Sequence, residues 1–155
     1  MLQGDIQGAG KVSNLMTTFF TGKSTARGLI FDRFDKIRNR IEVTMIGRWL
    51  ENSFRLDETF AYADGTVEER IWSVKFAGDG TLQAHCPSLA GEVKGWSNDE
   101  EVAMGYRYPV PIGGRVFNLD FDDHMYRMGE NMLLERVRMS KFGITVGEII
   151  LTFRK

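Results

Sequence analysis

Gly113 and Gly114 stand between two runs of residues that alternate between apolar and polar side chains. A two-residue β-turn of this type needs positive φ angles, which glycine adopts without strain. Placing Ile112 opposite Arg115 then fixes every later pair of the hairpin. The pairs on one face are Val110 with Phe117, Tyr108 with Leu119, Tyr106 with Phe121 and Met104 with Asp123, and Arg107 meets Asp120 on the other face. Residues 106–126 therefore predict an antiparallel hairpin with one face in a core.

Similar apolar-rich runs recur about every 8 to 12 residues from position 26 onward, a spacing typical of a β-sandwich or β-barrel. The predicted strands cover residues 26–34, 38–49, 53–62, 66–77, 80–86, 90–97, 101–112, 115–126, 132–141 and 144–154. A long up-and-down series of strands leaves two open edges unless the sheet closes on itself. We therefore expect an all-β fold, a single antiparallel up-and-down barrel of eight to ten strands.

Residues 11–21 are the one good helix candidate. The apolar residues at helical spacing are Val12, Leu15, Met16 and Phe19. Ser13 and Asn14 can cap the start of this segment, and Gly22 stands at its end. We expect a short N-terminal helix lying against the sheet, preceded by a loose arm at residues 1–10.

The turn between the third and fourth runs decides which residues face each other. A three-residue turn at 63–65, with glycine in the left-handed conformation at its last position, places Glu58 opposite Arg70. This register also gathers apolar residues on one face, namely Phe54, Leu56, Phe60, Trp72, Val74 and Phe76. The sequence therefore predicts a charged pair in the middle of an apolar face.

The last two runs predict another hairpin, with a turn at residues 141–143. In this register Arg136 meets Glu148 on the outer face. The residues that share the inner face are Leu133, Val137, Met139, Ile149 and Leu151.

The composition excludes several classes of protein. A chain of 155 residues fits one domain, which we assign to residues 1–155. The 20 basic and 21 acidic residues give no field that attracts nucleic acid, and the single cysteine, Cys86, allows no intrachain disulfide.

No stretch approaches the ~20 apolar residues of a membrane span, and residues 1–10 lack the regions of a signal peptide. We expect a soluble protein, cytoplasmic if this is the full chain and periplasmic if a signal segment has been removed.

Several short motifs are spread over nearly the whole chain. They are Phe19-Phe20-Thr21-Gly22, Gly47-Arg48-Trp49, Leu56-Asp57-Glu58-Thr59-Phe60, Asp64-Gly65, Arg70-Ile71-Trp72, Phe121-Asp122-Asp123-His124-Met125 and Met139-Ser140-Lys141-Phe142-Gly143. In combination they resemble an uncharacterised bacterial family of lipocalin-like β-barrel proteins, a domain of unknown function whose members are often lipoproteins. The resemblance implies a calycin-type barrel and no assigned activity. Because the N-terminus shows no lipobox cysteine, membrane anchoring does not carry over.

The charged pair inside the predicted barrel has two interpretations. Arg70 can bind a carboxylate or phosphate of a ligand, since a guanidinium offers two parallel donors. Glu58 and Arg70 can equally satisfy each other as a structural pair. The sequence leaves both readings open.

Other chemically suggestive residues predict no site. On a strand Asp122 and His124 point to one side and Asp123 to the other, which leaves too few ligands for a metal. His85 and Cys86 are adjacent, as are Ser140 and Lys141, so neither pair forms a facing nucleophile and base. We therefore predict no catalytic residue, no metal and no cofactor.

Two classes of function remain, with an enzyme of the barrel type as a third. The first is a binding protein for a small apolar or amphipathic molecule, such as a fatty acid or related lipid, held inside the barrel. Its predicted ligand-binding residues are Arg70, Glu58, Trp72, Tyr106, Tyr108 and Phe60. The second is a structural or interaction domain with a filled interior. A cavity of about 300 Å³ or more favours binding, and a packed interior favours the second class.

Overall fold

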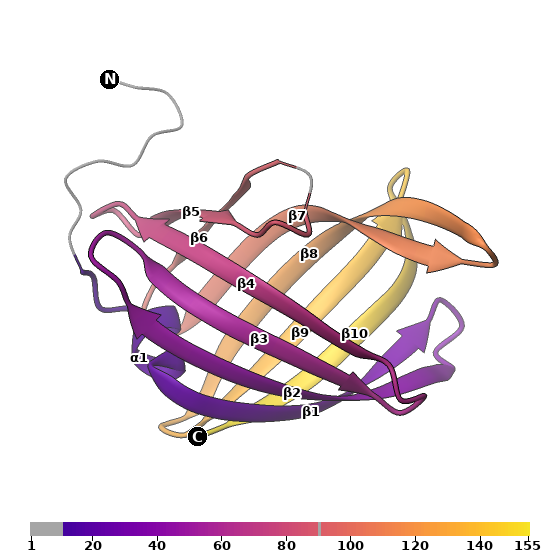
Figure 1. The fold of residues 1–155 in the computed structure, drawn as a ribbon, viewed down its shortest axis with the longest axis horizontal. Helices are drawn as coiled ribbons and strands as arrows, with labels where there is room; N and C mark the ends of the chain where they lie inside the picture. The colour runs from indigo at the N-terminus through magenta and orange to yellow at the C-terminus, as the bar shows by residue number, and fades with distance from the viewer. Residues whose placement is uncertain (1–10, 90) are drawn as a thin grey trace.

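Each strand of the chain pairs with the next strand in sequence, and the last pairs with the first. A computed structural model describes residues 11–89 and 91–155, with the arrangement shown in Figure 1. The strands are β1 (Gly22–Asp32), β2 (Ile37–Trp49), β3 (Phe54–Tyr62), β4 (Val67–Phe76), β5 (Thr81–His85), β6 (Val93–Ser97), β7 (Glu101–Ile112), β8 (Arg115–Gly129), β9 (Met132–Lys141) and β10 (Ile144–Arg154). They form a closed antiparallel barrel in the order β1-β10-β9-β8-β7-β6-β5-β4-β3-β2. The predicted all-β up-and-down barrel is confirmed, with ten strands.

Two of the predicted hairpins have the predicted register. Gly113 and Gly114 adopt φ angles of 58° and 79° in a two-residue turn between β7 and β8. Between β3 and β4 the turn has three residues, with Gly65 at φ 90°, and Glu58 lies directly opposite Arg70. Both hairpins therefore bring the expected side chains into the barrel.

The predicted three-residue turn between β9 and β10 is wrong. Lys141 pairs directly with Ile144, so the turn has two residues. Phe142, at the first turn position, has a φ of 53°, and its side chain is 88% exposed. A bulge between Thr145 and Gly147 then shifts the register and returns the apolar residues to the inner face. Arg136 lies opposite Ile150, yet its guanidinium still reaches Glu148 at 3.2 Å as a diagonal neighbour.

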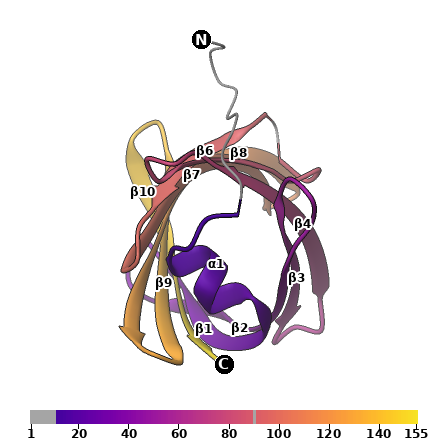
Figure 2. The same ribbon diagram turned by 90° about the vertical axis from the view of Figure 1, so that its left-hand side faces the viewer.

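The helix α1 (Leu15–Phe20) is shorter than predicted and lies across one end of the barrel (Figure 2). It begins after Asn14, whose side chain and that of Thr17 form a capping box at the helix start. Every residue of α1 except Thr18 is buried. The helix thus closes the mouth of the barrel, whereas the sequence predicted that it would lie against the sheet. The predicted loose arm at residues 1–10 is outside the described part of the chain.

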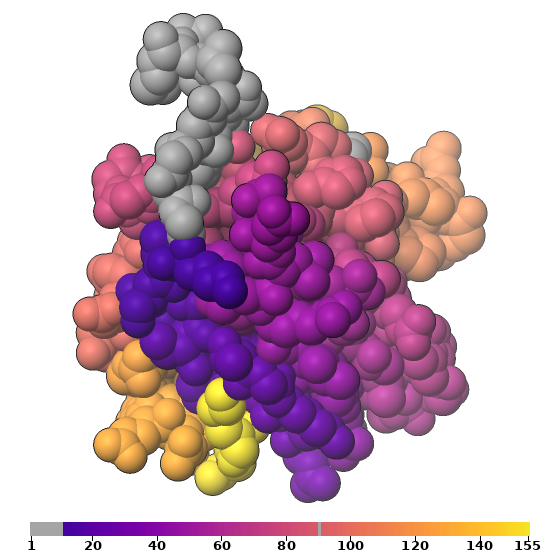
Figure 3. All heavy atoms as spheres, turned by 60° about the vertical axis from the view of Figure 1, so that its left-hand side comes forward, coloured from indigo at the N-terminus to yellow at the C-terminus, as the bar shows by residue number. Residues whose placement is uncertain are grey.

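The helix end of the barrel is densely packed. Four phenylalanines there are among the largest fully buried side chains, Phe19, Phe20, Phe54 and Phe153. The rings of Phe20 and Phe153 pack edge to face with 5.2 Å between their centroids. The C-terminal residue Lys155 donates a hydrogen bond from Nζ to the carbonyl oxygen of Thr21, so the end of the chain lies beside the end of α1 (Figure 3). Because this end is filled, the remaining space of the interior lies farther along the barrel.

Candidate ligand site inside the barrel

A small enclosed cavity lies in the barrel interior beyond α1. It has a volume of about 60 Å³ and extends from Met16 on the helix to Tyr62 near the opposite end of β3. Its walls are mostly apolar and include four methionines, Met16, Met45, Met104 and Met125. This volume corresponds to about two water molecules at the density of the liquid. It is well below the ~300 Å³ of an ordinary ligand pocket, so most of the interior is filled by side chains.

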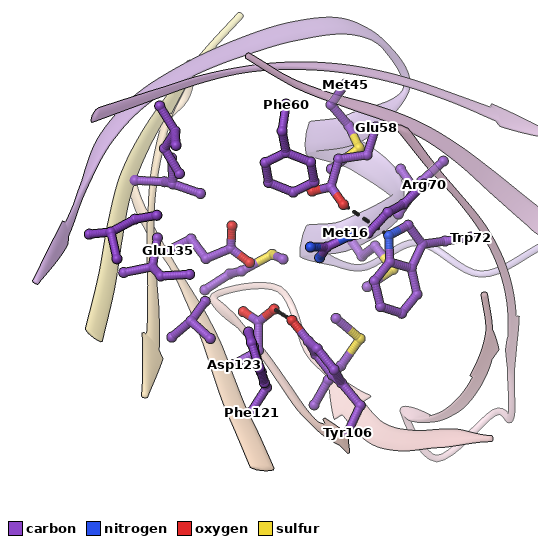
Figure 4. Close-up of a pocket in the computed structure, with 18 of the residues that line it drawn as sticks. Met16, Met45, Glu58, Phe60, Arg70, Trp72, Tyr106, Phe121, Asp123 and Glu135 are labelled. Atoms are coloured by element: carbon purple, nitrogen blue, oxygen red, sulfur yellow. Dashed lines mark hydrogen bonds between the residues drawn. The ribbon is translucent and has the colours of Figure 1, made fainter. Parts of the chain in front are cut away.

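Glu58 of β3 points into this cavity and is 7% exposed. Its carboxylate oxygen Oε1 accepts a hydrogen bond of 3.0 Å from the indole Nε1 of Trp72 (Figure 4). Burial raises the pKa of Glu58 from its usual 4.5 to about 7, although the charge of Arg70 and the bond from Trp72 both act to lower it. At neutral pH, Glu58 therefore exchanges readily between its neutral and ionised forms.

Arg70 of β4 is the basic side chain of the cavity wall and is 8% exposed. Its Nη2 donates to Oε1 of Glu68 at 2.7 Å, and its guanidinium lies 4.0 Å from the ring centroid of Tyr108 and 4.6 Å from that of Phe60. Burial acts to lower the pKa of Arg70, but the charges of Glu58 and Glu68 outweigh it and keep the guanidinium protonated. The ion pair of Arg70 is thus formed with Glu68 rather than with Glu58, the cross-strand partner.

Glu68 is the centre of a second polar group, farther from α1. Its carboxylate accepts hydrogen bonds from Tyr62 at 3.1 Å, from Tyr108 and from Arg70. Partial burial would raise the pKa of Glu68, but the bonds from Tyr108 and Arg70 and the charge of Arg70 hold it below its usual range. Glu68 therefore remains ionised and compensates the charge of Arg70.

Asp123 and Glu135 place two more carboxyl groups in the same cavity. Asp123 of β8 pairs with Val137, and Glu135 of β9 pairs with Met125, so the two acids are diagonal neighbours on the inner face. The hydroxyl of Tyr106 donates to Oδ2 of Asp123 at 3.0 Å. Burial raises the pKa of both acids, and the nearby charge of Asp123 raises that of Glu135 further. Burial therefore favours a protonated carboxyl group within this pair.

The structure brings the predicted binding residues together around this cavity. Five of them line it, namely Arg70, Glu58, Trp72, Tyr106 and Phe60. Tyr108 lies against Arg70 and Glu68. The sequence did not identify Glu68 and Glu135 as parts of the site, although both lie at inward positions of their strands. The alternation that put Val137 inside also puts Glu135 inside, so its strand register was sufficient to find it.

The residues considered for metal binding are separated as expected. Asp122 and His124 face outward and contact each other at 2.9 Å between Oδ1 and Nε2, while Asp123 faces inward. Within residues 11–89 and 91–155, no group of three or more His, Cys, Asp or Glu side chains is arranged to hold a metal ion. In the same residues, no helix has the length and apolar character needed to cross a membrane.

Comparisons with known proteins identify the family of this chain and two structures with a similar fold. Residues 5–155 match the sequence model of a family described as "Protein of unknown function (DUF3833)". A protein of unknown function from the DUF3598 family of Nostoc punctiforme PCC 73102 has a TM-score of 0.63 at 12% identity over 92% of this chain, which spans 49% of that protein. The S-type phycobiliprotein lyase CPES from Guillardia theta has a TM-score of 0.66 at 5% identity over 90% of each chain. No curated protein matches the sequence. At such low identities the two structures show a shared fold alone.

Proposed function

We propose that this chain, which belongs to the DUF3833 family, binds a small apolar or amphipathic molecule inside its barrel. The proposal rests on one observation, the group of buried ionisable side chains in the cavity wall. The members of this group are Glu58, Arg70, Asp123 and Glu135.

Buried ionisable groups of this kind do not make a filled barrel more stable. An ionised side chain loses several kcal/mol of hydration on burial, and apolar residues of similar volume are often as stable or more stable in its place. Buried ionisable groups with shifted pKa values are accordingly concentrated at functional sites. The cavity wall keeps four of them, and Arg70 is the one that has an ion-pair partner, Glu68, within 4 Å among the described residues. Their presence therefore supports a site that contacts a polar group of a ligand.

The four methionines of the wall provide a way to enlarge the site. Methionine is unbranched and polarisable, so it adapts to different neighbours at low energetic cost. Rotation of Met16, Met45, Met104 or Met125 would extend the 60 Å³ of the unliganded cavity toward the volume of a short apolar chain. We propose that the apolar part of the ligand lies among these side chains, with the aromatic rings of Trp72 and Tyr106 beside it.

The ligand that the sequence predicts is a fatty acid or related lipid anchored by Arg70. The Nε of Arg70 has no hydrogen-bond partner within residues 11–89 and 91–155 and could contribute to such an anchor. An anionic head group would, however, compete with Glu68 for the same guanidinium and would lie close to Glu58. We therefore propose a lipid-like ligand whose polar end contacts the buried ionisable groups of the cavity wall, without requiring that Arg70 alone binds it.

A filled interaction domain is the second candidate, and the small cavity favours it. In that case the buried acids serve the barrel itself, and another protein contacts its outer surface. The likeness to a phycobiliprotein lyase does not separate the two candidates, because the likeness is one of fold alone.

Native mass spectrometry of the protein purified from cells, before and after denaturation and refolding, tests the proposal. A discrete added mass that is lost on denaturation is the expected result. It should be followed by titration of the refolded protein with short-chain and long-chain amphiphiles. If no molecule copurifies and none of the panel binds more tightly than about 1 mM, the filled barrel replaces the binding proposal.

A further inference from the structure

The cavity wall carries more acidic than basic groups. Glu58 from β3, Asp123 from β8 and Glu135 from β9 all point into it, as Figure 4 shows. The opposing positive charge is that of Arg70, which Glu68 already compensates at 2.7 Å. None of the ion pairs found in residues 11–89 and 91–155 includes Glu58, Asp123 or Glu135. The uncompensated charge of the interior is therefore negative whenever these acids ionise.

One oxygen of Asp123 lacks a fixed donor inside the cavity. The side chain is 4% exposed, and its Oδ2 accepts the hydrogen bond from Tyr106. Its other oxygen, Oδ1, is buried and accepts from no N–H or hydroxyl group among the described residues. Asp123 is also within hydrogen-bond reach of the carboxyl group of Glu135, which can donate to it only while it is protonated. When Glu135 ionises, Asp123 therefore requires another donor.

We infer that the ligand of this barrel carries a primary ammonium group, which binds between Asp123 and Glu135 and donates to Oδ1 of Asp123. The inference rests on the proposed function, that the barrel interior binds a small molecule.

An ammonium group matches the chemistry of this position. It has three N–H donors and no acceptor, and it compensates carboxylate charge at the same time. The rings of Tyr106, Phe121 and Trp72 line the same cavity, and aromatic rings attract cations. A carboxylate ligand would instead bring a negative charge beside Glu58, Asp123 and Glu135, whose ionisation burial already disfavours. The free volume of about 60 Å³ accepts the ammonium and its first carbon, and the rest of the chain requires the methionines to move.

Binding of an ammonium replaces the proton that burial favours on the pair of Asp123 and Glu135. The charged and titratable groups that face this pair are Tyr106 from β7, Glu58 from β3 and Arg70 from β4. Tyr106 remains neutral because burial, followed by the charges of Asp123 and Glu135, raises its pKa well above the usual value. The amine should therefore bind more tightly as the pH rises through the raised pKa values of the two acids, with release of a proton to solvent.

Isothermal titration with four compounds of one chain length tests the head group. Hexylamine, hexanol, hexanoate and hexyltrimethylammonium share the apolar chain and differ in charge and donors. We expect hexylamine to bind at least tenfold more tightly than each of the other three at pH 8. Equal or tighter binding of hexanoate would assign the anchor to Arg70 and overturn the inference. Equal binding of hexanol or of hexyltrimethylammonium would also overturn it. Absence of binding by all four would overturn the proposed function as well, so the two failures are distinguishable.

Asp123→Asn and Asp122→Asn form a matched pair of variants, because the two residues are adjacent and face opposite sides of β8. Asp123→Asn should lower the affinity for hexylamine at least tenfold and leave the affinity for hexanol unchanged. Binding of hexanol also reports that the barrel is folded. Asp122→Asn should change neither the affinity for hexylamine nor that for hexanol. Glu135→Gln is the second inner variant if Asp123→Asn does not fold. Unchanged hexylamine affinity in a folded inner variant would refute the assignment.

Discussion

Replacement of Glu58 by glutamine should stabilise the protein at high pH. The amide oxygen of glutamine can still accept the hydrogen bond that Trp72 donates to Oε1 of Glu58 at 3.0 Å. The substitution removes the carboxyl group whose pKa burial raises to about 7. A group whose pKa is higher in the folded than in the unfolded protein contributes stability that is fully present below about pH 4.5 and is lost as the pH rises through about 7.

The size of the effect follows from the two pKa values of Glu58. The folded value of about 7 differs from the usual 4.5, and each pH unit between them corresponds to 1.36 kcal/mol. Ionisation of Glu58 thus lowers the free energy of unfolding by about 3 kcal/mol at pH 8. The Glu58→Gln protein should be more stable than the wild type by about this amount at pH 8 and by about 1 kcal/mol or less at pH 5.

Urea unfolding of both proteins at pH 5, 6, 7 and 8 measures this difference directly. Asp57→Asn is the control, because Asp57 is adjacent in sequence and faces outward with a side chain that is partly exposed. The difference in the free energy of unfolding between Asp57→Asn and the wild type should not grow between pH 5 and pH 8. If Glu58→Gln is less stable than the wild type at pH 8, the ionised carboxylate stabilises Arg70, and the reasoning from burial is refuted.

Three further substitutions test the packing around the site, each by urea unfolding. Glu68→Gln should lower the free energy of unfolding by about 2 kcal/mol, because buried Arg70 loses its carboxylate partner; no change would mean that another carboxylate replaces it. Asn14→Ala should cost about 1 kcal/mol through loss of the capping box of α1, and an unchanged midpoint would contradict a stabilising cap. Gly47→Ala should cost about 3 kcal/mol, because a Cβ there would lie 2.0 Å from the carbonyl oxygen of Phe20; a fully stable variant would contradict the close approach of helix and strand.

The strand pairings were predictable because turn chemistry and alternation determine them together. Gly113 and Gly114 fix one hairpin, and the left-handed Gly65 fixes another, so the positions of Glu58 and Arg70 followed by counting. The β9–β10 hairpin was predicted less well, because its turn has two residues rather than three and a bulge follows Thr145. Gly147, a glycine inside the strand beside that bulge, was the available signal for it.

The hydrogen-bond partners inside the barrel were not predictable from register. Arg70 has carboxylates both across the strand at Glu58 and two residues earlier at Glu68, and both face inward. Which of them it binds depends on side-chain conformation and on the hydroxyl groups of Tyr62 and Tyr108, which also donate to Glu68. The place of α1 was also undetermined, because an apolar helix face fits a barrel mouth as well as an outer sheet surface.

The most direct test of ligand binding inside the barrel is an NMR titration of protein labelled with ¹³C at the methionine methyl groups. Hexylamine and hexanol are added separately, and the methyl signals are followed to saturation. The account predicts that the signals of Met16, Met45, Met104 and Met125, which line the cavity, shift with the ligand, while that of Met128, which is 52% exposed on the outer surface, does not. Unchanged signals from all four cavity methionines at saturating ligand would contradict binding in the interior.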